Sequence, residues 1–93
     1  MTISFDSRVR IPDHVLVSHL EGESVLLNLR SECYFGLDNI GTRFWEKLEK
    51  SPSIQSVYET LLADYDVDPE TFRVDLTELL NSLVQQGLVE FAQ

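Results

Sequence analysis

The sequence has few of the residues on which redox, metal-binding and nucleophilic sites depend. Among its 93 residues there are one cysteine, Cys33, and two histidines, His14 and His19. A single cysteine cannot form an internal disulfide, and this cysteine usage gives no sign of an oxidising compartment. The histidines have no cysteine or carboxylate partners at ligand spacing, so we expect both to pack on a strand or at the surface. We therefore expect no metal and no cofactor.

Long hydrophobic runs are also missing. No apolar stretch approaches the roughly 20 residues that a membrane helix requires. The start of the chain, residues 1–6, lacks the basic region and apolar run of a signal peptide. These absences predict a soluble, cytoplasmic protein that has no membrane partner.

Basic side chains are scarce, with seven against sixteen acidic ones and a formal net charge of −9. Such a surface repels a phosphate backbone, which argues against nucleic acid as a partner. Between Glu59 and Glu78 the chain places seven acidic side chains and only Arg73 in reply. This half of the molecule would attract a basic peptide or a basic protein face, although an acidic surface that only aids solubility explains the charge equally well.

The composition is that of one globular domain over residues 1–93, with 43% hydrophobic and 25% charged residues. After an N-terminal arm at residues 1–14, where Pro12 keeps the chain extended, β-branched and alternating residues predict strands. Gly22 supplies a tight turn between the first two strands. The predicted strands are Val15–Leu20, Ser24–Leu29 and Cys33–Leu37, and residues 88–91 add a short terminal strand.

The rest of the chain predicts three helices, because apolar residues recur at helical spacing after good capping residues. The first runs from a cap at Asp38 or Asn39 to about Glu49, with Ile40, Phe44, Trp45 and Leu48 on one face. The second runs from Ser53 to about Tyr65, after a break at residues 51–53. The third starts at Asp68, carries an apolar stripe of Phe72, Leu76, Leu79, Leu80 and Leu83, and ends at Gly87. Three antiparallel strands followed by three helices indicate an α+β domain similar to a winged helix-turn-helix.

Two features of the third predicted strand bear on function. Cys33 lies beside two aromatic residues, where a lone cysteine is expected to be a small buried hydrophobe rather than a nucleophile. The strand ends at Gly36 and Leu37 and passes directly into a helix, so it is a candidate edge strand. An edge strand carries unpaired N–H and C=O groups that a peptide can complete, unless another part of the fold covers them.

The sequence as a whole resembles the PqqD-like family over roughly residues 15–90. The likeness rests on residues 25–29, on the run from Tyr34 to Gly41 and on residues 44–48, followed by the ordered C-terminal pattern between Tyr65 and Val89. The resemblance implies a recognition element for ribosomally synthesised, post-translationally modified peptides. Such proteins bind the leader segment of a precursor peptide as an added strand against their third strand, in a groove shared with their third helix.

Carried onto this sequence, the resemblance implies a groove between Cys33–Leu37 and the helix of residues 68–86. Its stripe must mostly face the core, so the groove should be lined by one flank of that helix. One flank carries Thr71, Asp75, Glu78 and Ser82, and the other carries Arg73, Thr77 and Val84. We favour the Asp75 flank, whose carboxylates would pair with basic leader residues. The predicted peptide-binding residues are Glu32, Cys33, Tyr34, Phe35, Gly36, Leu37, Thr71, Val74, Asp75, Glu78 and Leu79.

Within this family the chain looks most like the stand-alone recognition proteins of lasso-peptide clusters. That likeness implies a non-catalytic protein that passes the leader to a separate leader peptidase, followed by a macrocyclase. A peptide chaperone of the pyrroloquinoline quinone pathway is an alternative. A winged-helix transcriptional regulator is another, although its recognition helix should be basic and this one offers only Arg73. A small hydrolase or redox protein that uses Cys33 is the third.

Overall fold

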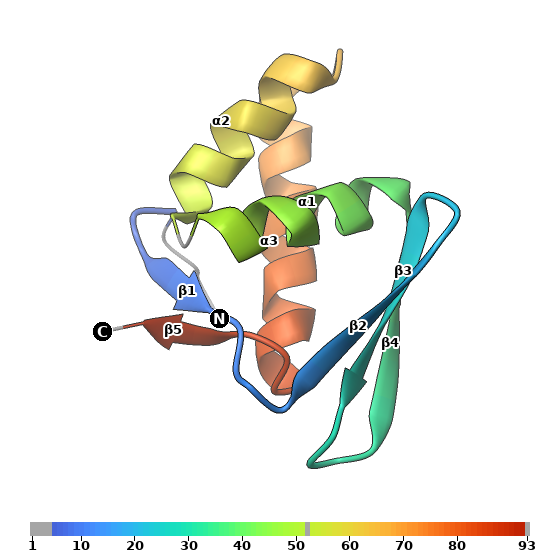
Figure 1. The fold of residues 1–93 in the computed structure, drawn as a ribbon. Coiled ribbons are helices and arrows are strands. Elements are labelled where there is room, and N and C mark those ends of the chain that lie inside the picture. The colour runs from blue at the N-terminus through green and yellow to red at the C-terminus, as the bar shows by residue number, and fades with distance from the viewer. Residues whose placement is uncertain (1–4, 52, 93) are drawn as a thin grey trace.

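The computed structural model describes residues 5–51 and 53–92. Parts of the predicted N-terminal arm (residues 1–4) and of the predicted break before the second helix (residue 52), and residue 93, lie outside the described residues. The elements are β1 (Arg8–Arg10), β2 (Val15–Leu20), β3 (Glu23–Asn28), β4 (Cys33–Leu37), α1 (Asn39–Lys50), α2 (Ile54–Asp64), α3 (Pro69–Gln85) and β5 (Glu90–Ala92) (Figure 1).

The three predicted strands form an antiparallel sheet in the order β2-β3-β4. Gly22 adopts a φ of +76°, which allows the tight turn that joins β2 to β3. On β3 every second side chain is buried, from Ser24 through Leu26 to Asn28, so one face of the sheet packs on the helices. Three strands followed by three helices confirm the predicted α+β, winged-helix-like fold.

The three helices begin where the capping residues predict. The side chain of Asp38 accepts a hydrogen bond from the Gly41 N–H, and Ser53 and Asp68 cap α2 and α3 in the same way. Gly87, with a φ of +71°, follows the end of α3. The helices contribute the larger part of the core, through the buried side chains of Phe44, Trp45, Leu48, Ile54, Val57, Tyr58, Leu61, Phe72, Leu76, Leu80 and Leu83.

The N-terminal segment, which was predicted to be an arm, contributes side chains to the core. Within the predicted arm, β1 pairs antiparallel with β5, and Arg10 forms an ion pair with Glu90 across this ribbon. Val9 and Phe5 are each only 2% exposed. The pairing joins the two ends of the described chain beside the C-terminal half of α1, a contact that local sequence patterns do not contain.

Two residues lie differently from the sequence prediction. Cys33 was expected to be a small buried hydrophobe, and that is wrong, because at the start of β4 its side chain is exposed. Ile40 was assigned to the buried face of the first helix, yet it is 37% exposed.

Two hydrogen-bonded contacts set the direction of the helices against the sheet. The Asn28 Nδ2 donates to the Gln86 carbonyl oxygen at 2.7 Å, and Asn28 pairs with Cys33 in the sheet. At the other end of β4, Ser24 pairs with Leu37 and its buried hydroxyl lies 2.8 Å from the Thr42 hydroxyl. The end of α3 therefore lies near the start of β4, and the start of α1 lies near its end.

Candidate functional site

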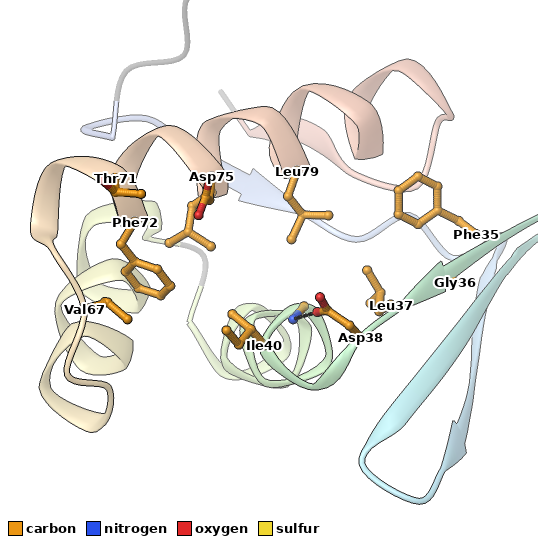
Figure 2. A pocket seen from close by; sticks show the side chains of 12 residues that line it. Phe35, Gly36, Leu37, Asp38, Ile40, Val67, Thr71, Phe72, Asp75 and Leu79 are labelled. Atoms are coloured by element: carbon orange, nitrogen blue, oxygen red, sulfur yellow. Dashed lines mark hydrogen bonds between the residues drawn. The ribbon is translucent and has the colours of Figure 1, made fainter.

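A largely apolar groove lies where the end of β4, the first turn of α1 and the first half of α3 meet. It encloses about 520 Å³, within the range of pockets that hold small ligands or side chains. Figure 2 shows side chains from all three elements, and from the loop before α3, turned toward this space. Its lining consists of Phe35, Gly36, Leu37, Asp38, Ile40, Gly41, Val67, Thr71, Phe72, Asp75, Leu76 and Leu79.

The edge of β4 forms one wall of this groove. In the sheet order β2-β3-β4, the strand pairs with β3 on one side only. Phe35 and Leu37 point to the helix side, whereas Tyr34 points to the outer face and is 73% exposed. Gly36 contributes only backbone, and a Cβ at this position would have no heavy atom within 4 Å. Within residues 5–51 and 53–92, a backbone edge without a second strand thus borders an apolar space.

Polar groups in the groove are few, and two of the three are engaged locally. The Asp38 carboxylate accepts from the Gly41 N–H at 2.8 Å, and the Thr71 hydroxyl donates to the Asp68 carboxylate at 2.8 Å. The side chain of Asp75 has no hydrogen bond or ion pair to any other residue that the structure describes. Of the carboxylates that line the groove, that of Asp75 is therefore the one without a hydrogen-bond or ion-pair partner among the described residues.

The carboxylate of Asp68 is the capping group of α3. The hydroxyl of Thr71, and then its backbone N–H, hold the pKa of Asp68 below its ordinary value, because both hydrogen bonds favour the charged form. Because its pKa is lowered in the folded state, this carboxylate stabilises the fold above the ordinary pKa of 3.8. That contribution is lost as the pH falls through the lowered value. The same bonds hold Thr71 in the lining of the groove.

The structure brings together six of the eleven predicted site residues. Phe35, Gly36 and Leu37 line the groove from β4, and Thr71, Asp75 and Leu79 line it from α3. The other five, Glu32, Cys33, Tyr34, Val74 and Glu78, are exposed but are not part of its lining. Contact with a peptide stays a prediction for all eleven.

The flank of α3 that faces β4 is the one with Thr71 and Asp75, although Ser82 on the same flank does not line the groove. The opposite flank is used inside the fold, where the Arg73 guanidinium lies 4.0 Å from the centre of the Phe5 ring. Such a cation–π contact stabilises the packing of the N-terminal segment on α3.

Sequence reasoning missed the floor and the far end of the groove. Ile40, Phe72 and Leu76 were assigned to the apolar faces of helices, and Gly41 and Val67 were not among the predicted site residues. An exposed valine in a polar loop is a weak signal that becomes informative only once the loop is placed beside α3. In the described ranges 5–51 and 53–92, no group of His, Cys, Asp or Glu is suited to hold a metal ion. No helix in that part of the chain is long and apolar enough to span a bilayer.

Residues 23–89 match the family model described as coenzyme PQQ synthesis protein D, PqqD, which is most of the chain. The chain belongs to the PqqD family. This membership confirms the resemblance that was drawn from the sequence.

A solved structure is also similar to this chain. It is TbiB1 in complex with the TbiA(beta) leader peptide, which superposes with a TM-score of 0.82 and is 36% identical. The match covers 90% of this chain and 99% of TbiB1. No curated protein shows significant sequence similarity to the chain.

Proposed function

We propose that this PqqD-family protein binds the leader segment of a ribosomally synthesised precursor peptide, and that the segment adds as a strand to the free edge of β4. The observation that carries the proposal is the coincidence of that edge with an apolar groove closed by α3. The similarity to TbiB1, whose structure contains a leader peptide, supports it.

The physical basis is that of strand addition. The edge of β4 supplies backbone donors and acceptors that give affinity without regard to sequence. The groove lets alternate side chains of the bound segment bury apolar surface against residues such as Leu37, Ile40 and Leu79. Backbone pairing and side-chain burial together allow an extended peptide to be bound selectively.

We further propose that the protein is not an enzyme and that it delivers its leader to separate cytoplasmic enzymes, a leader peptidase and then a macrocyclase of a lasso-peptide pathway. Its lack of an evident nucleophile–base pair in the sequence supports this role. A pyrroloquinoline quinone peptide chaperone would use the same groove. A DNA-binding role is disfavoured because Arg73, the only basic residue of α3, packs over Phe5.

Fluorescence polarisation tests leader binding. The probe is a fluorescein-labelled leader of a precursor peptide to be identified among the neighbouring genes, and the control is the same composition in scrambled order. We expect saturable binding of the leader only, together with slowed amide hydrogen exchange across Cys33–Leu37 in the complex. Equal binding of the scrambled peptide would refute leader recognition. Binding without added protection on β4 would refute strand addition.

A further inference from the structure

The groove has a direction relative to the strand that borders it. The end of α3 lies beside the start of β4 through the hydrogen bond from Asn28 to Gln86. Helix and strand therefore run in opposite senses: Leu79 lies opposite the end of β4 at Leu37 and Asp38, Phe35 lies farther toward the end of α3, and Thr71 lies beyond the end of the strand (Figure 2). A segment antiparallel to β4 would run in the same sense as α3.

The spacing of residues along one face of α3 is close to the spacing of side chains along one face of an extended strand. Thr71, Asp75 and Leu79 are four residues apart, so each step along α3 is about 6 Å. Alternate residues of an extended strand are about 6.7 Å apart and point to the same face. Three successive inward side chains of a bound strand would consequently meet these three levels of the helix in turn.

The three levels of the groove, at Thr71, Asp75 and Leu79, differ in chemistry. At the Thr71 level the neighbours are Val67 and Phe72, both apolar, and the Thr71 hydroxyl is already engaged. At the Leu79 level the neighbours from β4 are also apolar. Between these two levels the groove presents Asp75, whose carboxylate has no partner among the described residues.

We propose that the groove selects a segment with the pattern apolar–x–basic–x–apolar, read from its N-terminus, in which the central basic side chain pairs with Asp75. This selectivity rests on the proposed function, because it assumes that a strand is added to β4. Asp75 is exposed in the free protein, but apolar residues line the groove around it, so a strand laid over it would exclude part of the water that screens a charge pair. A strand that leaves Asp75 unpaired would partly desolvate the carboxylate without compensation, which makes this position discriminating.

A chain with a net charge of −9 attracts any basic peptide. The experiment must therefore distinguish this general attraction from pairing of one basic side chain with Asp75. Successive side chains of a strand point to opposite faces, and this alternation allows the two effects to be distinguished. A lysine moved by one residue keeps the charge of the peptide but points to the opposite face. Only the inward lysine can reach Asp75.

The experiment uses labelled nonapeptides based on Ser-Thr-Leu-Thr-Lys-Thr-Leu-Thr-Ser. Companion probes carry glutamine or glutamate at the centre, or the lysine shifted to the preceding position. We expect the central-lysine probe to bind about fivefold more tightly than the glutamine probe and than the shifted-lysine probe. The glutamate probe should bind most weakly.

Variants of the protein then show whether the preference for a central lysine depends on Asp75. Asp75→Asn should remove the preference for central lysine, and Asp75→Lys should reverse it in favour of glutamate. Glu46→Gln, which makes the same change of charge on α1 outside the groove, should retain the preference. The inference is overturned if the shifted lysine binds as tightly as the central one, if Asp75→Asn retains the preference, or if no probe binds.

Failure of this inference is distinguishable from failure of the proposed function. Saturable binding of the natural leader with no preference for a central lysine would leave leader binding standing and remove the role of Asp75. Absence of binding by the natural leader would remove the proposed function itself.

Discussion

The β1–β5 ribbon and the β2-β3-β4 sheet lie at opposite ends of α1 and differ in what their edges contact (Figure 1). The ribbon is three residues long on each side, and the adjoining Phe5 and Val9 are buried in the core. The larger sheet ends in β4, whose side chains are mostly exposed and whose edge borders the groove. We infer that the ribbon serves stability, while the edge of the sheet is left available for a partner.

The sharpest test of this division is Phe5→Ala. Phe5 is buried, lies edge-on to the Tyr58 ring at 5.3 Å between ring centres and sits under the Arg73 guanidinium. Its removal should lower the free energy of unfolding by about 3–5 kcal/mol. Urea denaturation measures the loss. The leader affinity of the remaining folded protein should not change, and a selective loss of affinity would contradict the division.

A medium effect is expected where the sheet is joined to α1. Thr42→Val removes one partner of the buried Ser24–Thr42 hydrogen bond and should lower the free energy of unfolding by about 1–3 kcal/mol. Thr42→Ser keeps the hydroxyl and is the matched control. Thermal unfolding of both variants checks the result. If Thr42→Ser loses more stability than Thr42→Val, packing of the methyl group rather than the hydrogen bond joins these elements.

The smallest change in stability is expected inside the groove. Because Ile40 is partly exposed, Ile40→Ala should lower the free energy of unfolding by under about 1 kcal/mol. It should nevertheless weaken leader binding several-fold, since it removes apolar surface from the groove floor. Leu16→Ala is the control, because Leu16 is 51% exposed on β2 away from the groove. Equal effects of both variants on affinity would place the peptide elsewhere.

Which residues build the site was only partly predictable. Phe35 and Leu37 could be assigned from the alternation of the third strand, and Thr71 and Asp75 from their place beside the apolar stripe of α3. Cys33 and Tyr34 were included because the whole strand was carried over, yet alternation turns Tyr34 to the outer face. Glu78 flanks the same stripe, but it does not line the groove.

The sequence by itself determined the elements, because their signals are local. Capping by Asp38, Ser53 and Asp68, the turn at Gly22 and the apolar stripe of α3 each depend on neighbours within a few residues. Tertiary structure alone decided which surfaces meet. The pairing of β1 with β5 joins residues some 80 positions apart, and Arg73 of α3 packs on Phe5 of the N-terminal segment. Local patterns carry no information about such contacts, nor about the packing that brings Ile40 and Asp75 into one groove.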